Sequence, residues 1–275
     1  MRTVITAGHL ITPEQWIDSP VVLVEDGTIL DVQPRHAMEI PAGARSLDFP
    51  SLILAPGFID IHIHGGAGHD VMEADESARA RIETQLVQHG VTAFLPTTVT
   101  APEDRILRAL EFLGHATQSK EGQGRAQPLG IHLEGPFISH AKRGVHPPAN
   151  LVQPSPEILE RFWQASQGAI RMMTIAPELT GAAETIRYAR TLGVHSSLGH
   201  SNATYAETQA GIAAGAGHAT HTFNAMRPLD HRDPGILGAV LAIPAAAAVP
   251  ALIRFVAERQ ERQAAAEESL RAALP

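Results

Sequence analysis

Short apolar runs alternate with tight turns over the first 54 residues. The runs are RTVITAGHLIT, SPVVLVEDGTILDV and RSLDFPSLILA, which are rich in Val, Ile, Leu and Thr. Such runs, separated by Gly and Pro, are typical of β-strands joined by tight turns. The pair Asp26–Gly27 between two apolar runs predicts a β-hairpin. We therefore expect residues 1–54 to form a small N-terminal β-layer.

The pattern changes at residue 55, where short apolar runs begin to alternate with Ala-rich stretches of helical periodicity. Strands are expected at 57–65, 91–98, 129–136, 171–178, 194–201 and 218–225. Helices are expected between them, at 76–90, 101–116, 155–166, 180–193 and 202–216. Strand–helix alternation predicts parallel βα units. The chain is thus expected to be α/β, with about six units of an incomplete (β/α)8 barrel of the TIM type over residues 55–243. An open doubly wound sheet is disfavoured, because no glycine-rich phosphate loop follows the first strand.

The last segment, residues 244–275, differs in composition and is interpreted as a divergent, Ala-rich tail. No charged residue lies between Gly235 and Ile253, a length that could span a membrane. Ala and Gly dominate this stretch and two prolines interrupt it, so we expect no membrane span. The end of the tail is expected to form an exposed helix.

Composition narrows the class of protein. The chain has 275 residues, of which 44% are hydrophobic, and this excludes a disordered chain, a collagen and a coiled coil. The net charge of −8 and the lack of a basic run argue against nucleic-acid binding. The N-terminus lacks the apolar core of a signal peptide, so a cytoplasmic protein is expected. The chain has no cysteine and 15 histidines, so any metal must be bound by His, Asp or Glu.

Two of the expected strands carry the first candidate ligands. His62 and His64 lie two residues apart on a strand, which directs both imidazoles to one face. Glu134 ends an apolar strand and is followed by Gly-Pro. A buried, unpaired carboxylate is costly, so it needs a cation. A divalent metal meets this need, and a salt bridge to an Arg is the alternative.

Further histidines end the last two expected strands. His200 and His221 lie 21 residues apart, about one βα unit, so neighbouring strands would present them side by side. A carboxylate and two histidines with an open position are typical of a catalytic metal site. Ser201 and Asn202 also suit a helix N-cap. His195 and His218 lie earlier on their strands and are expected in the core or behind the ligands.

The segments that hold these residues resemble the N-acetylglucosamine-6-phosphate deacetylases of the amidohydrolase superfamily. They are PGFIDIHIHGGAGHD, TAFLPTT, GIHLEGPFIS, KRGVHPP, MTIAPE, SLGHSNATY, THTFNAM and HRDPGILGA, in this order between residues 56 and 241. The combination of HLEGPF, GHSNA and TH-x-FNAM is specific to this family, whereas HxH alone indicates only the superfamily. The resemblance implies a small β-layer and a metal-dependent βα barrel.

The resemblance also implies roles for particular residues. Glu134, His200 and His221 match the main metal ligands, and His62 and His64 match a pair that holds a second metal in some members. The residues that match substrate contacts are Val145, His146, Asn224, Ala225 and Arg232. Arg232 matches a phosphate-binding residue that reaches the neighbouring subunit's site, which implies a homodimer. The cofactor would be one or two divalent ions, Zn or Fe.

The sequence departs from the family after residue 243. No Asp follows Asp233 and no His follows His231. A strand-seven Asp-Gly-x-His segment and a strand-eight Thr-Asp-Ala segment, whose Asp is the general acid/base of the family, are therefore missing. The pattern indicates a family sequence whose last third is absent or replaced. We expect a deacetylase that forms glucosamine 6-phosphate and acetate, with activity impaired in this chain.

Two alternatives remain open. One is another amidohydrolase that acts on a cyclic amide or a nucleobase. Such enzymes usually have a carboxylated Lys as a bridging ligand, but the two lysines, Lys120 and Lys142, are not near expected strand ends. The other is a non-catalytic remnant that binds a metal or a sugar phosphate, since an open six-stranded barrel exposes two strand edges.

Overall fold

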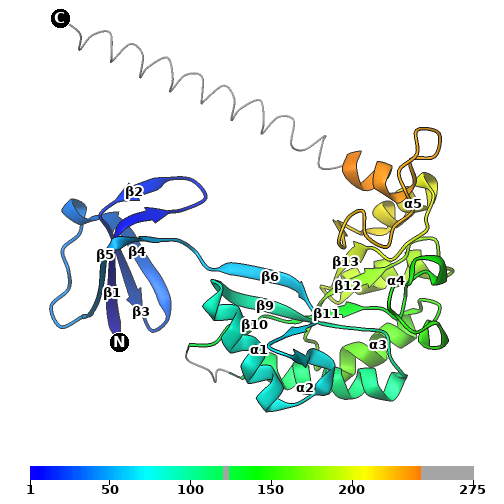
Figure 1. The fold of residues 1–275 in the computed structure, drawn as a ribbon, viewed down its shortest axis with the longest axis horizontal. Coiled ribbons are helices and arrows are strands. Elements are labelled where there is room, and N and C mark those ends of the chain that lie inside the picture. Colours follow the sequence, from blue (N-terminus) through cyan, green and yellow to red (C-terminus); the bar gives the residue numbers. More distant parts are fainter. Residues whose placement is uncertain (120–123, 243–275) are drawn as a thin grey trace, which may run out of the picture. The chain divides into compact units, whose positions relative to one another are not determined.

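A computed structural model describes residues 1–119 and 124–242 of the chain. The chain divides into two compact units, one from Met1 to Phe58 and a second that begins at Ile59 (Figure 1). Each unit has its own hydrophobic core.

The first unit is a five-stranded sheet. Its strands are β1 (Arg2–Ile11), β2 (Trp16–Asp18), β3 (Pro20–Glu25), β4 (Thr28–Pro34) and β5 (Arg45–Leu54), and a 3-10 helix, η1 (Arg35–Ala37), follows β4. The strands run in the order β2-β1-β3-β4 and are antiparallel, while β5 pairs with β1 in parallel. The small core includes Leu10, Ile17 and Val22.

The predicted hairpin is present between β3 and β4. Glu25 and Thr28 are paired, so Asp26 and Gly27 form a two-residue turn. Both turn residues have positive φ, 49° and 83°. A two-residue hairpin turn of this kind favours Asp-Gly, because its twist matches that of the flanking strands.

The second unit contains six βα-type strands, as the sequence predicts. These are β6 (Phe58–Ile63), β9 (Val91–Thr98), β11 (Ile131–Glu134), β12 (Ile170–Ile175), β13 (His195–Leu198) and β14 (His218–Ala219). The helices between them are α1 (Glu76–Gln88), α2 (Glu103–Gln118), α3 (Pro156–Ala165), α4 (Ala182–Thr191) and α5 (Tyr205–Ala214). The short elements are β7 (Gly65–Gly66), β8 (His69–Asp70), η2 (Val71–Glu73), β10 (Gln127–Pro128), η3 (His140–Lys142) and η4 (Pro148–Asn150).

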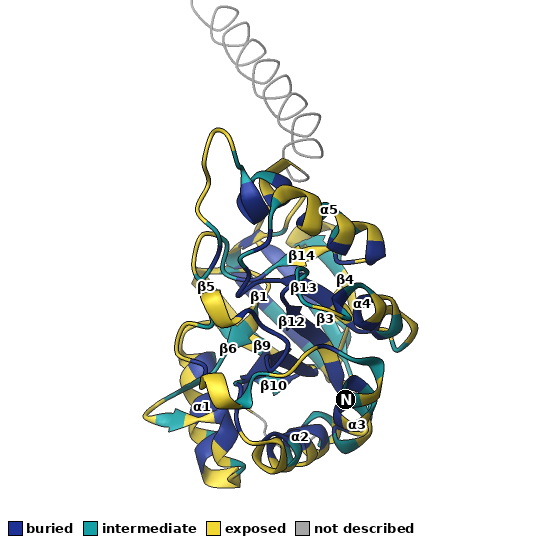
Figure 2. Cartoon of the chain, turned by 90° about the vertical axis from the view of Figure 1, so that its right-hand side faces the viewer, coloured by how far each residue is buried: buried dark blue, intermediate teal, exposed yellow. Residues whose placement is uncertain are grey.

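These six strands and the short β10, which pairs with β9 in parallel, form one curled sheet with helices on its outer side (Figure 1), whereas β7 and β8 pair with each other. The order is β9-β11-β12-β13-β14 with parallel pairing throughout, and β6 pairs with β9. The strands β12 and β13 are buried except for one exposed residue in each, whereas the helices expose one side (Figure 2). The expected fold class, a partial (β/α)8 barrel with an N-terminal β-layer, is confirmed.

Local sequence signals explain where the helices begin. Asp75 caps α1, and Ser155 caps α3 with Pro156 at its first position. Thr204 caps α5 and forms a capping box with Glu207. The cap of α5 is therefore Thr204, and the expectation that Ser201 or Asn202 fills this position is wrong.

The last expected strand is shorter than predicted. Residues 218–225 were expected to be extended, but β14 ends at Ala219. His221, Phe223 and Ala225 have positive φ, which turns the chain sharply. The predicted tail, 244–275, lies outside the described residues. Within the described residues, no helix is long and apolar enough to cross a membrane.

Candidate metal centre

Glu134 lies at the carboxyl end of β11, and its side chain is 2% exposed. Side chains alternate along a strand, so Leu133 packs in the hydrophobic core while Glu134 faces the opposite side. The Oε1 atom of Glu134 has no hydrogen-bond partner. A buried oxygen without a donor is a strong sign of an additional cation.

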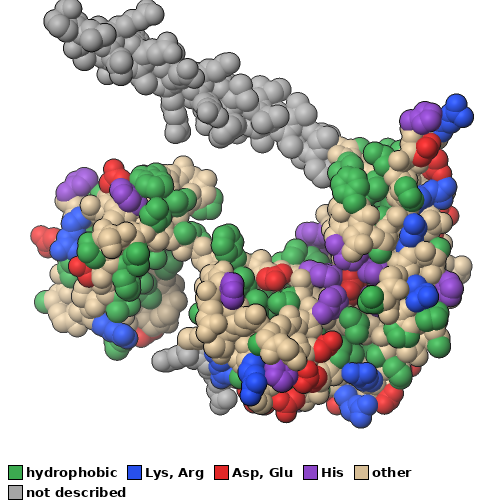
Figure 3. Space-filling view, viewed as in Figure 1, with side chains coloured by type: hydrophobic (Ala, Val, Ile, Leu, Met, Phe, Trp, Pro, Cys, Tyr) green, Lys and Arg blue, Asp and Glu red, His purple; other side chains and the backbone are tan. Residues whose placement is uncertain are grey.

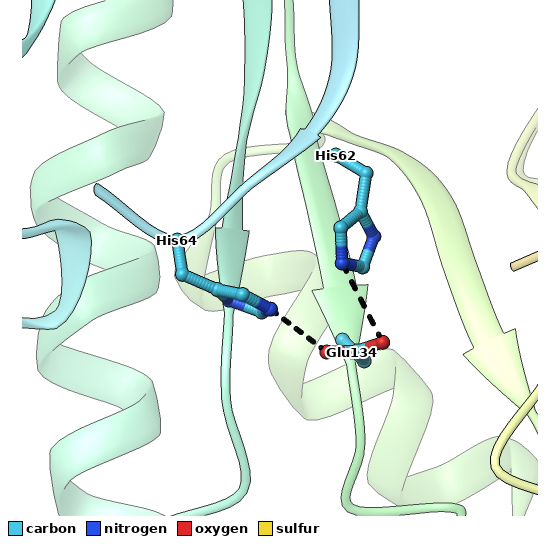
Figure 4. Close-up of side chains that lie close together, drawn as sticks. All are labelled: His62, His64 and Glu134. Carbon is cyan, nitrogen blue, oxygen red and sulfur yellow. Dashed lines mark ion pairs between the residues drawn. The ribbon is translucent and has the colours of Figure 1, made fainter. Parts of the chain in front are cut away.

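Five imidazoles surround this carboxylate, and histidines gather with an acidic group in the hollow of this unit (Figure 3). His62 on β6 and His64 just after its end are two of them, and their Nε2 atoms point to Glu134 (Figure 4). The distances from Nε2 to the nearer carboxylate oxygen are 3.7 Å for His62, 3.0 Å for His64, 3.6 Å for His146, and 3.3 Å for both His200 and His221. Every ion-pair partner of Glu134 in the described part of the chain is a histidine, so the Arg alternative has no support.

Backbone carbonyls hold three of these rings through their Nδ1 atoms. His64 Nδ1 lies 2.9 Å from the Thr97 carbonyl oxygen, and His200 Nδ1 lies 2.8 Å from that of Lys142. His221 Nδ1 lies 3.1 Å from the Asn224 carbonyl oxygen. A carbonyl only accepts, so each Nδ1 carries the proton and each Nε2 presents a lone pair to the centre. This arrangement is typical of metal-binding histidines.

The His200 and His221 rings provide a direct test of whether a cation fits. Their Nε2 atoms are 3.0 Å apart. Because both Nδ1 atoms donate to carbonyls, two neutral rings would place two lone pairs against each other. A proton or a metal ion between them removes this repulsion. Two groups have ligand atoms within 4.8 Å of one another: His62, His64 and Glu134, and Glu134, His200 and His221. The residues therefore fit one or two divalent ions such as Zn or Fe.

Burial and close contact shift the pKa values of Glu134 and the histidines around it. Burial alone would raise the pKa of Glu134, but the surrounding imidazoles lower this pKa far below its usual range. Burial lowers the pKa of His62. Burial also opposes the charge on His64, but contact with Glu134 raises its pKa, and the same contact raises the pKa of His221. The carboxylate is therefore charged at neutral pH.

Both strand-end candidate ligands, His200 and His221, have a strained backbone. His200 has φ of 46° and His221 has φ of 31°, in the left-handed region that non-glycine residues seldom adopt. Such conformations cluster at functional sites and cost of order 1–3 kcal/mol each. The segment after His200 is fixed by Glu178, which accepts hydrogen bonds from the Ser201 hydroxyl (2.7 Å) and the Asn202 amide (2.6 Å).

Next to the candidate metal centre, buried polar side chains form a series of hydrogen bonds. They are His132, Thr174, Thr220 and Ser197. His132 Nδ1 donates to the Ile61 carbonyl (3.0 Å), so Nε2 accepts from the Thr174 hydroxyl (2.7 Å). The Thr220 hydroxyl then donates to Thr174 (2.8 Å), and Ser197 donates to Thr220 (2.7 Å). Burial lowers the pKa of His132 to about 4. Sequence analysis did not predict this series of hydrogen bonds. Side chains two residues apart on a strand share a face, so the position of Glu134 does indicate that His132 lies on the same face of β11.

The expected substrate residues are distributed unevenly. His146 is 2% exposed and lies beside Glu134, whereas its neighbour Val145 is 90% exposed. Asn224 contributes its carbonyl to His221, and the Ala225 carbonyl accepts from the Ser201 amide. Arg232 is exposed, and within the described residues its side chain has no hydrogen bond or ion pair.

One expectation about the histidines is wrong. His195 and His218 were expected in the core or behind the ligands, but both are exposed. Their rings face each other at 5.6 Å between centroids. Each lies at the start of its strand, at the opposite end from the ligands, so strand polarity separates them from the site.

Comparison with known proteins finds a profile of the Amidohydrolase family that matches residues 53–261. The N-acetylgalactosamine-6-phosphate deacetylase of Escherichia coli O157:H7 is 37% identical over 241 residues, which cover 88% of this chain and 62% of the relative. The N-acetylglucosamine-6-phosphate deacetylase of Vibrio furnissii is 39% identical over 243 residues, which cover 86% of this chain and 59% of the relative.

Solved structures agree with this relationship. The crystal structure of N-acetyl-D-glucosamine-6-phosphate deacetylase from Mycobacterium smegmatis aligns with a TM-score of 0.76 at 34% identity, covering 86% of this chain and 60% of that one. The corresponding enzyme from Pasteurella multocida aligns with a TM-score of 0.78 at 30% identity, covering 88% and 62%. The chain thus spans about three fifths of the length of these relatives.

Proposed function

The chain belongs to the amidohydrolase family, and from this premise we propose that it carries the metal site of a deacetylase for an N-acetylated amino sugar 6-phosphate. N-acetylglucosamine 6-phosphate is the proposed substrate, and glucosamine 6-phosphate and acetate are the products. One observation carries the proposal: the buried Glu134 Oε1 has no hydrogen-bond partner and lies 3.3 Å from the Nε2 atoms of both His200 and His221.

In this proposal Glu134, His200 and His221 hold one divalent ion, and His62 and His64 complete a second site with Glu134. Such an ion supplies a Lewis acid that polarises the acetyl carbonyl and lowers the pKa of the attacking water. The protein's own contribution is orientation. The carbonyls of Lys142 and Asn224 keep the lone pairs of His200 and His221 directed to the centre.

The sugar phosphate would be bound by the residues around the rim. His146 supplies a ring beside the carboxylate, and the Asn224–Ala225 turn leads directly away from His221. The exposed Arg232 is free to bind a phosphate through two nitrogens at once. If it reaches a neighbouring subunit, as the family resemblance implies, the active form is a homodimer. A cytoplasmic location completes the proposal.

Catalysis by this chain is proposed to be weak. The family's general acid/base is an Asp in a strand-eight segment, and no Asp follows Asp233 in this sequence. General acid–base catalysis typically contributes about 10²–10⁴-fold. The amine would then leave without a positioned proton donor.

The test is acetate release from N-acetylglucosamine 6-phosphate by the 275-residue chain loaded with Zn²⁺ or Fe²⁺. We expect slow turnover that requires the metal and disappears in Glu134→Gln. The rate should lie about 10²–10⁴-fold below that of a relative that has the Asp. A chain that binds no metal would overturn the site assignment, and a rate equal to the relative's would overturn the impairment. N-acetylgalactosamine 6-phosphate, the substrate in the name of one relative, is the parallel substrate.

A cyclic-amide or nucleobase hydrolase is less well supported. Enzymes of that kind usually need a Lys near the metal, but Lys142 contributes its backbone oxygen to His200. Lys120 lies outside the described residues. The same assay with a cyclic amide and a nucleobase as substrates separates this alternative.

A further inference from the structure

His146 lies in a loop and makes hydrogen bonds to two residues outside the strands, Arg143 and Thr100. Its amide donates to the Arg143 carbonyl (3.1 Å), and its own carbonyl accepts from the Arg143 guanidinium (3.1 Å). Its ring packs edge-on against the His200 ring, with 4.7 Å between centroids. The position of the ring is therefore determined before any ligand binds.

Thr100, just after β9, makes the decisive contact. The backbone N–H of Thr100 donates to His146 Nδ1 over 3.2 Å, and both residues are 2% exposed. A backbone amide can only donate, so this Nδ1 has to accept. The Thr100 hydroxyl lies 2.8 Å from the same nitrogen and is able to donate as well. In a neutral imidazole with an accepting Nδ1, the proton is on Nε2.

This places His146 in the opposite tautomer from its neighbours. The Nδ1 atoms of His64, His200 and His221 face carbonyl oxygens, so in the neutral form of each of these rings Nε2 carries no proton. His146 faces an amide instead, so its Nε2 presents an N–H. An N–H cannot coordinate a metal, although this Nε2 lies only 3.6 Å from Glu134 Oε2.

Gly135 makes the contact with Thr100 possible. It has φ of 74°, and a Cβ there would lie 2.1 Å from the Thr100 hydroxyl oxygen. A side chain at this position would displace the Thr100 side chain, whose hydroxyl lies 2.8 Å from His146 Nδ1. Two consecutive residues therefore contribute to the site: Glu134 supplies the carboxylate, and Gly135 leaves room for Thr100 to contact His146.

We propose that Thr100 is a positioning residue that fixes His146 as the Nε2–H tautomer, so that His146 is a hydrogen-bond donor in the site and not a metal ligand. The proposal deepens the proposed function, because it rests on the same metal site. In this proposal the Nε2–H of His146 donates a hydrogen bond to Glu134 or to a polar acceptor of the bound substrate.

The direct test is the protonation state of the imidazole nitrogens, from ¹H–¹⁵N correlation spectra of the ¹⁵N-histidine-labelled, metal-free chain at pH 8. His146→Gln and His200→Gln assign the two rings. We expect an unprotonated Nδ1 at His146 and a protonated Nδ1 at His200, which donates to the Lys142 carbonyl. A protonated Nδ1 at His146 overturns the proposal. This measurement does not require enzyme turnover. It therefore tests the tautomer of His146 even if the deacetylase assay detects no activity.

Two variants at Thr100 separate its amide from its hydroxyl. Thr100→Val removes only the hydroxyl and should leave the tautomer unchanged. Replacement of Thr100 by the α-hydroxy analogue of valine removes both the amide and the hydroxyl donor, and it should populate the Nδ1–H form. An unchanged tautomer in this double replacement refutes the role of Thr100.

A second experiment measures the Zn²⁺ affinity of histidine variants and tests whether His146 is a metal ligand. His146→Gln should retain the wild-type affinity within about 3-fold, because its Nε2 is not a ligand. His200→Gln is the matched comparison and should lose on the order of 10-fold or more. Equal losses in the two variants would make His146 a ligand and overturn the assignment.

Discussion

The buried His132 should make the stability of the second unit depend on pH. Its pKa is lowered to about 4 by burial, against an ordinary value of 6.5. Between these values the unfolded chain binds a proton that the folded chain does not. Stability is therefore complete above pH 6.5, falls as the pH decreases, and levels off below about 4. At about 1.4 kcal/mol for each pKa unit, the full loss is about 3 kcal/mol.

The perturbation is His132→Gln, which retains an amide for the Ile61 carbonyl and an oxygen for the Thr174 hydroxyl but does not titrate. Urea unfolding of the metal-free protein at pH 7.5 and pH 5 gives the free energy of unfolding. In a Trp16→Phe background, Trp163 reports the second unit, because its ring packs against that unit's core. Wild type should lose about 2 kcal/mol more than the variant between the two pH values.

Comparing the pH dependence, and not the stability itself, removes the uniform cost of placing Gln in the core. His115→Gln is the control, because His115 is an exposed histidine on α2. Its pH dependence should match that of wild type. The reasoning is refuted if His132→Gln shows the same decline as wild type, since burial of His132 would then not be its source.

Three further outcomes follow from the structure. Glu134→Gln should abolish stoichiometric Zn²⁺ binding in calorimetry, whereas the exposed Glu111→Gln should bind normally; binding by both would place the ion elsewhere. Phe162→Ala removes a ring that is 1% exposed and should lower the free energy of urea unfolding by about 3–5 kcal/mol; a loss below about 1 kcal/mol would mean that this core is loosely packed. Thr204→Ala removes the capping box of α5 and should cost about 0.5–2 kcal/mol in the same measurement, and Thr204→Ser should restore most of it.

Hydrophobic pattern was sufficient to predict the six strands and the five helices between them, and the positions of His and Glu on the strands were sufficient to predict which side chains lie together. Period-two spacing put His62 and His64 on one face, and the rule that parallel strands end at one edge of the sheet brought Glu134, His200 and His221 together. These predictions needed only strand direction and order. They did not require the conformation of any loop.

The hydrogen bonds that orient His146 and His200 depend on loop conformation, which the hydrophobic pattern of the sequence does not predict. The pairing of Thr100 with His146 spans 46 residues and requires the turn at Gly135. The Lys142 carbonyl reaches His200 from a 3-10 helix 58 residues earlier in the chain. Because a backbone carbonyl or amide is present at every residue, sequence does not indicate which one is used.

The same limit explains the error at the end of the last strand. THTFNAM reads as an extended apolar run, yet His221 and Ala225 adopt φ of 31° and 49°. Propensity alone would place Gly in these conformations. A glycine at 221 would relieve the strain but would remove the imidazole that lies 3.3 Å from Glu134. The same positive φ at His200, 46°, is what a metal site at these two strand ends would require, because there the position of the imidazole would outweigh local backbone preference.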